Sequence, residues 1–237
     1  MTLLAKNLYK KYKNKYVVNN VSFKLNKGEI VGLIGPNGAG KTTSFYMIVG
    51  IIKPDKGKIL LHKEDITKKP MHQRSKKGIG YLSQEPSIFR KLSVEDNILC
   101  ILEMQRKFYK ERKKITEKLI EELGLQNIRN HRGDLLSGGE RRRTEIARCL
   151  AINPEFIFLD EPFSGIDPIA IEELQKILLS LKRKNIGILI TDHNVQETFT
   201  ITDRIYLMFQ GEILKHGSTV EIMQDSVVKK VYLGNRF

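Results

Sequence analysis

GPNGAGKT, from Gly35 to Thr42, is the stretch that decides the fold of this chain of 237 residues. It fits the pattern G-x-x-x-x-G-K-[S/T], in which glycines allow backbone N–H groups to approach phosphate oxygens. The apolar run from Glu29 to Ile34 precedes it and predicts a buried strand. Residues with helical spacing follow it, so bound phosphates would lie at the positive end of a helix dipole. The sequence therefore predicts a nucleotide-phosphate site between a strand and a helix.

The helix after this loop is predicted from four apolar residues at the spacing i, i+3, i+4 and i+7: Phe45, Ile48, Val49 and Ile52. We expect Lys53-Pro54-Asp55 to stop it. The ammonium of Lys41 would neutralise the β- and γ-phosphates of a nucleotide, and the hydroxyl of Thr42 would ligate Mg²⁺. A chance glycine-rich turn is the alternative. The residues expected to contact nucleotide are Gly35, Pro36, Asn37, Gly38, Ala39, Gly40, Lys41, Thr42 and Thr43.

Strand patterns alternate with helical patterns along the chain. Strands are predicted around Val21–Leu25, Lys58–His62, Gly78–Leu82, Phe156–Leu159, Gly187–Thr191 and Ile205–Phe209. Residues from Ser93 to Gly124 have a helical pattern, and Gly124 stands where a helix C-terminus favours a residue without Cβ. Alternation of this kind predicts an α/β fold with a mainly parallel sheet, with the mid-chain helices as an inserted lobe.

Acidic side chains follow an apolar strand in FIFLDEP. Asp160 would hold Mg²⁺ through water, and Glu161 would act as a general base toward an attacking water molecule. His193, in TDHN, follows another core strand and would reach the γ-phosphate, while Gln84 follows a third strand and would ligate the metal. Taken singly, an acidic pair also begins turns, and a lone histidine is more often structural.

The formal net charge of +14, from 41 Lys+Arg against 27 Asp+Glu, favours anionic partners such as nucleotides, nucleic acid or an acidic membrane surface. No nucleic-acid motif accompanies the charge, so we expect no direct nucleic-acid contact. No apolar run approaches the roughly 18 to 20 residues of a membrane helix, and charges interrupt the N-terminus, so we expect a cytoplasmic protein. Cys100 and Cys149 are expected to be reduced thiols.

A second glycine-rich helix start lies in LLSGGERRRTEIARCL, from Leu135 to Leu150. The hydroxyl of Ser137 and the amides of Gly138 and Gly139 would form a set of donors at a helix N-terminus. Ser137 and Glu140 also match the S-x-x-E capping box, so a purely structural cap is the alternative.

The ordered set GPNGAGKT, Gln84, LSGGE, FLDEP, SGID and His193 resembles the ATP-binding-cassette (ABC) ATPases across most of the chain. The resemblance implies a P-loop NTPase fold of the ABC type, with an N-terminal antiparallel β subdomain, a mainly parallel core sheet and an inserted helical lobe. It also implies a single ATPase domain over residues 1–237, with the lobe at about 86–148 and a C-terminal dimerisation segment at about 216–237.

In this family two cassettes pack head to tail, and the LSGGE motif of each chain caps the ATP held by the other. The resemblance therefore implies a homodimer with sandwiched ATP, in which Ser137, Gly138 and Gly139 contact the partner's nucleotide. The common family motif has Gln at the position of Glu140. Because an anion beside phosphate is unfavourable, we expect Glu140 to face away.

The same resemblance implies roles for single residues. Glu161 would be the general base, His193 its orienting partner, and Gln84 a sensor of metal and water. Asp167 would transmit a signal across the dimer. Tyr12 would stack on adenine, and two nearby tyrosines are alternatives for that role: Tyr9 and Tyr16.

Stretches such as GIGYLSQEPSIFRKLSV and VKKVYLG are similar to the ATPase subunit of bacterial lipopolysaccharide-export transporters. This similarity implies an ATP-hydrolysing subunit on the cytoplasmic face of the inner membrane, held there by two transmembrane permease subunits and powering the extraction of lipopolysaccharide. Phe89 would supply an apolar anchor and Arg90 a charge for a permease helix. The branched-chain amino-acid importer ATPase, which shares GPNGAGKTT, is one alternative. A soluble cassette ATPase acting on nucleic acid or ribosomes is another, although such proteins usually carry two cassettes.

Overall fold

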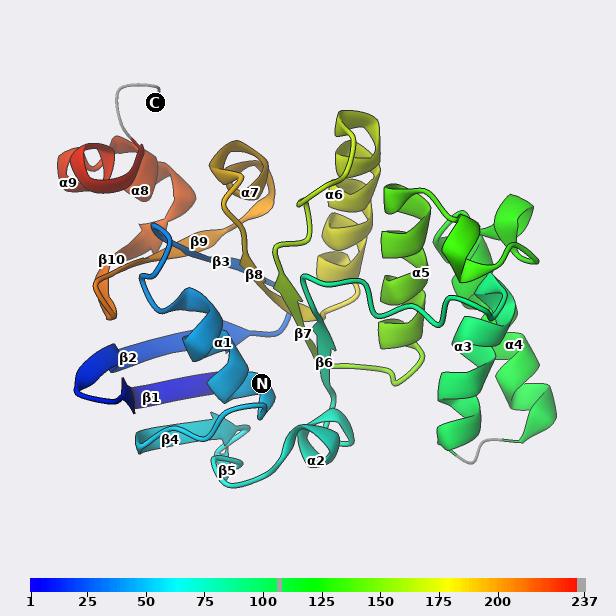
Figure 1. Ribbon diagram of the computed structural model, residues 1–237, viewed down its shortest axis with the longest axis horizontal. Helices are drawn as coiled ribbons and strands as arrows, with labels where there is room; N and C mark the ends of the chain where they lie inside the picture. Colours follow the sequence, from blue (N-terminus) through cyan, green and yellow to red (C-terminus); the bar gives the residue numbers. More distant parts are fainter. Residues whose placement is uncertain (106–107, 234–237) are drawn as a thin grey trace.

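The computed structural model describes residues 1–105 and 108–233, and a six-stranded sheet forms its centre (Figure 1). β10 pairs antiparallel with β9, whereas the other neighbouring strands pair in parallel, which confirms the α/β fold. In spatial order the strands are β10 (Glu212–Ser218), β9 (Arg204–Phe209), β3 (Ile30–Ile34), β8 (Gly187–Thr191), β7 (Phe156–Asp160) and β6 (Ile79–Leu82).

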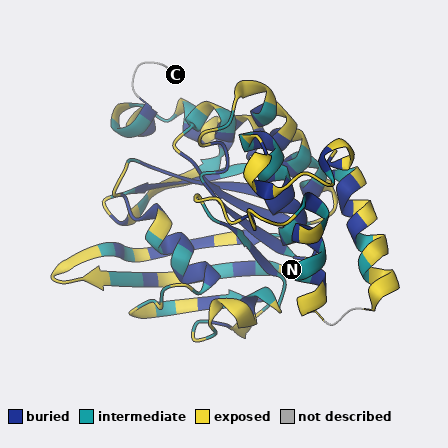
Figure 2. Ribbon diagram, turned by 45° about the vertical axis from the view of Figure 1, so that its right-hand side comes forward, coloured by how far each residue is buried: buried dark blue, intermediate teal, exposed yellow. Residues whose placement is uncertain are grey.

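Successive residues of the central strands pack on opposite faces of this sheet. Phe156 and Phe158 of β7 belong to one core cluster, while Ile157 and Leu159 belong to another. Every residue of β3, β7 and β8 is buried, because helices and a second sheet cover both faces (Figure 2). The carboxyl ends of these buried strands are the place where an α/β fold binds its ligands.

A four-stranded antiparallel sheet packs against one face of the centre. Its order is β2 (Lys15–Asn26), β1 (Thr2–Tyr12), β4 (Lys56–Leu61) and β5 (Glu64–Asp65). Helix α1 (Lys41–Val49) contributes Phe45, Met47 and Ile48 to the core cluster between the two sheets. This sheet confirms the N-terminal antiparallel β subdomain.

Helix α1 is shorter than the sequence predicts, and the expectation that it extends to Ile52 is wrong. It ends at Val49 because Gly50 adopts a left-handed φ of 90° and its N–H bonds to the carbonyl of Tyr46. A fully buried arginine, Arg74 of α2 (Met71–Ser75), donates to two carbonyl groups in the last turn of α1. Ile52 therefore packs against the core from a loop.

The mid-chain segment forms a helical group at one end of the molecule (Figure 1). The helical pattern from Ser93 to Gly124 is divided into α3 (Val94–Met104) and α4 (Tyr109–Glu122). Gly124 adopts a φ of 62° just beyond α4, as predicted for a helix C-terminus. Two 3₁₀ turns, at Gln126–Ile128 and Gly133–Leu135, lead into α5 (Gly138–Leu150).

Further helices cover the second face of the central sheet. Helix α6 (Pro168–Arg183) packs beside α5, and α7 (Val195–Ile201) follows β8. The described chain ends with α8 (Thr219–Gln224), α9 (Ser226–Val228) and a π-helical turn, η3 (Lys229–Leu233). The last four residues of the expected dimerisation segment, 234–237, lie outside the described residues.

Candidate active site

The phosphate loop joins the carboxyl end of β3 to the start of α1. Gly40, just before α1, has a φ of 99°, and a Cβ there would lie 2.4 Å from the carbonyl oxygen of Val17, so only glycine fits. The loop bounds a cavity of about 170 Å³ lined by residues 37–43, Val17 and Glu161. Seven of the nine predicted loop residues therefore surround one cavity, and the predicted base reaches the same cavity.

Lys41 lies inside this loop. Its Nζ donates to the carbonyl oxygens of Gly35 at 2.6 Å and Pro36 at 3.1 Å. Burial lowers the pKa of Lys41, while the negative charges of Glu161 and Asp160, and then Asp192, oppose that shift. An ammonium group held by backbone carbonyls at the N-terminus of a helix is well placed to bind phosphate oxygens.

Asp160, the last residue of β7, has an unusual environment for a carboxylate. Its Oδ1 accepts a hydrogen bond from the Thr191 hydroxyl at 2.8 Å, whereas Oδ2 is buried without a hydrogen-bond partner in the described chain. Desolvation raises the pKa of Asp160, the Thr191 hydrogen bond lowers it, and the charge of Glu161 raises it. An orphaned buried carboxylate oxygen suits a cation or a water bound to one, so the residues present fit Mg²⁺.

Within residues 1–105 and 108–233, no group of three or more His, Cys, Asp or Glu side chains is placed to hold a metal. A metal here would therefore depend on other oxygen donors besides carboxylates. The Thr42 hydroxyl at the start of α1 and the Gln84 amide are the groups that fit, together with phosphate oxygens and water.

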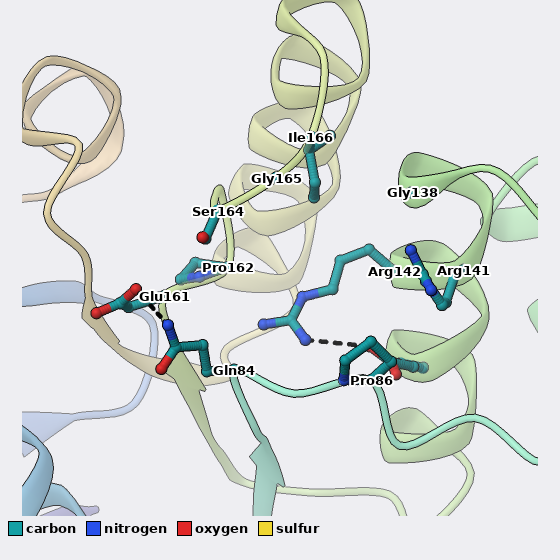
Figure 3. A pocket seen from close by; sticks show the side chains of 11 residues that line it. Gln84, Pro86, Gly138, Arg141, Arg142, Glu161, Pro162, Ser164, Gly165 and Ile166 are labelled. Atoms are coloured by element: carbon teal, nitrogen blue, oxygen red, sulfur yellow. Dashed lines mark hydrogen bonds and ion pairs between the residues drawn. The ribbon is translucent and has the colours of Figure 1, made fainter.

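Gln84, Glu161 and His193 come from three loops and meet at one carboxylate oxygen. Glu161 Oε2 accepts from Gln84 Nε2 at 2.8 Å (Figure 3). The same oxygen lies 3.2 Å from His193 Nδ1. The Glu161 side chain is 23% exposed, so the carboxylate remains accessible to water. The arrangement leaves one accessible carboxylate between an amide donor and an imidazole, a position from which it could accept a proton from water.

Glu161 is also strained. Its φ of 46° lies in the left-handed region, which is uncommon for residues other than glycine. Its N–H donates to the carbonyl of Thr191 at 2.7 Å, which fixes the backbone in that conformation. Strain of this kind is concentrated at functional sites, where the surrounding structure maintains it.

The residue predicted to stack on adenine does not line the cavity beside the phosphate loop. A cavity of about 710 Å³ beside the phosphate loop is lined by residues 15–17, 36–39 and 209–211, so Tyr16 lines it. Tyr12 is 46% exposed at the end of β1 and is not among those lining residues, although Lys10 Nζ lies 5.7 Å from its ring centroid. Tyr9 packs edge-on against Tyr16, with ring centroids 6.2 Å apart.

The LSGGE motif caps α5 with an exposed tip. Ser137 Oγ accepts from the Glu140 N–H at 3.3 Å, and Glu140 Oε2 accepts from the Ser137 N–H at 2.9 Å. The structural capping box is therefore present, and the carboxylate of Glu140 turns back toward the tip instead of facing away. The reason is that the free N–H of Ser137 binds it, and this backbone hydrogen bond lowers the pKa of Glu140. Gly139 lacks room for any side chain, because a Cβ would lie 2.6 Å from the Cβ of Ala170 on α6.

A buried ion pair on α5 connects this helix to the loop that carries Gln84, and the sequence analysis did not predict it. Arg142 and Glu145 lie 3.1 Å apart, with side chains 8% and 4% exposed. Arg142 Nη1 also donates to the Ser83 carbonyl at 2.9 Å, and Glu145 Oε1 accepts from the Ser87 N–H at 2.6 Å. The pair therefore holds both sides of the loop that carries Gln84. The i, i+3 spacing of Arg142 and Glu145 in ERRRTE is compatible with an ion pair, but pairs at this spacing usually lie on an exposed helix face.

The predicted partner-coupling residues lie at the surface beside this loop. Phe89 is 43% exposed, with the Arg148 guanidinium 4.4 Å from its ring centroid, and Arg90 is exposed. The fully buried Asn97 fixes the Phe89 backbone, accepting from its N–H at 2.9 Å and donating to its carbonyl at 3.1 Å. Sequence reasoning missed Asn97 and Arg148, whose roles depend on tertiary contacts.

Comparison with known proteins agrees with this geometry. The family profile described as "ABC transporter" matches residues 18–164, more than half of the chain. The chain belongs to the ABC transporter family. This cassette binds and hydrolyses ATP, as the phosphate loop and the Asp160–Glu161 pair imply.

The cassette is 52% identical over 237 residues to "Lipopolysaccharide export system ATP-binding protein LptB" of Escherichia coli strain K12, with 100% of this chain and 98% of the relative covered. A solved nucleotide-free ATP-binding cassette from an ABC transporter is 29% identical, with a TM-score of 0.88 and coverage of 99% and 100%. A dimeric bacterial ABC transporter cassette is 25% identical, with a TM-score of 0.81 and coverage of 92% and 98%. Among the described helices of this cassette, none has the length and apolarity needed to cross a membrane.

Proposed function

We propose that this cassette is the ATPase subunit that powers a lipopolysaccharide-export transporter. The observation that carries the proposal is the 52% identity to a lipopolysaccharide export ATP-binding protein over practically the whole of both chains. The exposed Phe89, which a permease helix would contact, lies in a stretch similar to that branch. In this proposal, ATP hydrolysis drives the extraction of lipopolysaccharide from the inner membrane.

The proposed chemistry begins with Glu161 removing a proton from a water molecule. The water oxygen attacks the γ-phosphorus, the bond from that phosphorus to the bridging oxygen breaks, and ADP and phosphate leave. His193, 3.2 Å from Glu161, orients the carboxylate, and Gln84 positions the water from the other side. Mg²⁺, when bound, would neutralise developing charge on the phosphates, and Thr42, Gln84 and Asp160 would hold it.

We infer that the active form is a head-to-tail homodimer. The exposed Ser137 and its neighbouring glycines are not among the described residues that line the phosphate-loop cavity of their own chain. The exposed tip of α5 at Ser137 would contact the partner's ATP, as the similarity to a dimeric cassette suggests. Asp167, which caps α6 by accepting from the Ala170 N–H at 3.0 Å, would transmit closure between the chains. Residues 216–237 would contribute to the same dimer, and residues 86–148 would form the lobe that carries Ser137.

The proposed partners are two permease subunits, which would place the cassette on the cytoplasmic face of the inner membrane. The exposed ring of Phe89 would enter a pocket on a permease helix, while Arg90 would pair with an acidic side chain there. The Arg148 guanidinium, 4.4 Å from the ring centroid, would help to hold the ring in place. We propose no direct contact between the cassette and nucleic acid.

Co-purification tests it. The tagged cassette is isolated from its native cell in mild detergent, and the proteins and lipids that elute are identified by mass spectrometry. Two permease-like subunits with bound lipopolysaccharide are the expected result. Permeases with an amino-acid-binding protein would move the assignment to a branched-chain amino-acid importer, and ribosomes or nucleic acid alone would remove transport altogether.

A further inference from the structure

The pair of helices α3 and α4 extends beyond the packed core of the helical lobe. The two helices lie side by side at one end of the molecule (Figure 1). The buried residues of α3 end at Leu102, and those of α4 begin only at Thr116. Residues 103–104 and 108–114, which we call the hairpin tip, therefore contain no buried side chain. Short helical segments gain most of their stability from packing, so packing within the chain does not explain this extension.

Large apolar side chains are exposed at the hairpin tip. Met104 is 81% exposed, Phe108 86% and Tyr109 67%. Phe108 occupies the N-cap position of α4 and makes no side-chain cap hydrogen bond there, although Ser, Thr, Asp or Asn would stabilise the helix start. The Arg112 guanidinium forms an ion pair with Glu103 at 2.8 Å, which joins α4 to α3 at the tip. Apolar side chains that are grouped and exposed in this way are typical of an interaction surface.

Positive charges accompany these apolar side chains. Lys110, Lys113 and Lys114 are exposed, and none of them forms an ion pair within residues 1–105 and 108–233. They lie in the first turns of α4, at the positive end of the helix dipole, where cations destabilise a helix. The spacing of four residues places Tyr109 beside Lys113 on one face of the helix, and Lys110 beside Lys114 on the neighbouring face. Helix stability therefore explains neither the lysines nor the exposed rings.

We propose that the hairpin tip docks on a membrane surface that carries anionic phospholipid head groups. The lysines bind the lipid phosphates, while the apolar side chains enter the boundary between head groups and acyl chains. Aromatic rings beside lysines are typical of segments at a membrane interface, which favours lipid over an acidic protein as the partner. The inference goes beyond the proposed function, because it adds a direct lipid contact to the attachment through permease subunits.

Fluorescence tests whether the rings enter the membrane. The chain contains no tryptophan, so the substitution Phe108→Trp introduces a single reporter at the hairpin tip. The full-length variant is mixed with vesicles of phosphatidylethanolamine and phosphatidylglycerol, or with vesicles of phosphatidylcholine alone. We expect the emission to shift to shorter wavelength with the anionic vesicles only, because the indole then leaves water for the head-group boundary. Val220→Trp, at an exposed position on α8, is the matched control and should show no shift.

Co-sedimentation with the same anionic vesicles tests the lysines. Each lysine near an anionic surface contributes about fivefold to binding, so the double variant Lys113→Gln, Lys114→Gln should bind about tenfold to thirtyfold more weakly than the wild type. The control is Lys56→Gln, Lys58→Gln, which removes two exposed lysines from β4 and changes the net charge equally. It should bind within about threefold of the wild type, since its lysines lie outside the hairpin tip.

Two outcomes would overturn the proposal. Equal losses for the two double variants would mean that the net charge of +14 attracts the vesicles without a defined surface. An unshifted Phe108→Trp spectrum, or an equal shift for Val220→Trp, would mean that the rings of the hairpin tip do not enter the membrane. No permease is present in either assay, so failure here and failure of the transport assignment are separately visible.

Discussion

The buried Arg142–Glu145 pair allows a quantitative prediction about how the helical lobe is joined to the catalytic loops. We consider Arg142→Met and Glu145→Gln, singly and together. With side chains 8% and 4% exposed, each group loses most of its hydration on folding, and the partner charge compensates for that loss. Removing one member of such a pair typically costs about 3–5 kcal/mol, because the remaining charge stays buried and unpaired.

The surrounding hydrogen bonds make the two single substitutions unequal. Arg142→Met leaves the Glu145 carboxylate with only the Ser87 N–H and hydroxyl, at 2.6 and 3.4 Å, and frees the Ser83 carbonyl. We therefore expect the full loss of about 3–5 kcal/mol in the free energy of unfolding. Glu145→Gln keeps an oxygen for the Ser87 N–H and leaves Arg142 bonded to the Ser83 carbonyl, so the expected loss is smaller, about 1–3 kcal/mol.

Equilibrium unfolding in urea, followed by circular dichroism on nucleotide-free protein, measures these losses. The double variant should be more stable than the sum of the single losses predicts, by at least about 1 kcal/mol, because the second substitution removes a charge that the first had left unpaired. The exposed pair Arg132–Asp134, with side chains 56% and 35% exposed, is the control. Its double-mutant cycle should give no more than about 1 kcal/mol.

Two results would refute this reasoning. Additive losses in the buried pair would mean that Arg142 and Glu145 act independently, through their backbone partners alone. A loss for Arg142→Met no larger than that for Arg132→Met would mean that the guanidinium is hydrated and that the lobe is not joined to the Gln84 loop by this pair.

Other predictions address the chemistry and the partner surface. Glu161→Gln should reduce ATP turnover by about 10²- to 10⁴-fold while prolonging the ATP-bound dimer, measured by phosphate release and size-exclusion chromatography; turnover near that of the wild type would remove the base role. Thr191→Val removes the hydrogen bond that lowers the pKa of Asp160, so that pKa should rise and the acidic limb of the ATPase profile should move to higher pH, whereas an unmoved limb would contradict a requirement for ionised Asp160. Phe89→Ala should leave ATP binding unchanged but weaken capture by the membrane partners in pull-downs. Val220→Ala, at a 63% exposed position on α8, is the control and should leave capture unchanged. Equal capture of both variants would place the coupling surface elsewhere.

The chemistry-bearing motifs were readable from the sequence because each is local. GPNGAGKT, between a strand pattern and a helix pattern, predicts the phosphate loop, since its glycines let backbone N–H groups approach phosphate oxygens. Strand β8 begins and ends as predicted, at Gly187 and Thr191, since a buried parallel strand leaves a continuous apolar run. The predicted end of α1 is wrong, because apolar periodicity continues to Ile52 whereas Gly50, at a φ of 90°, ends the helix after Val49.

The sequence by itself determined the α/β class, the phosphate loop and the residue types available for ATP hydrolysis, because strand period, helix period and turn chemistry act over a few residues. Only the tertiary structure decided which of these residues meet. Gln84, Glu161 and His193 are separated by 77 and 32 positions, and the parallel pairing of neighbouring strands brings their loops to one edge. The contacts of Arg142 and Asn97 likewise depend on burial and on the direction of each side chain, which residue spacing does not give.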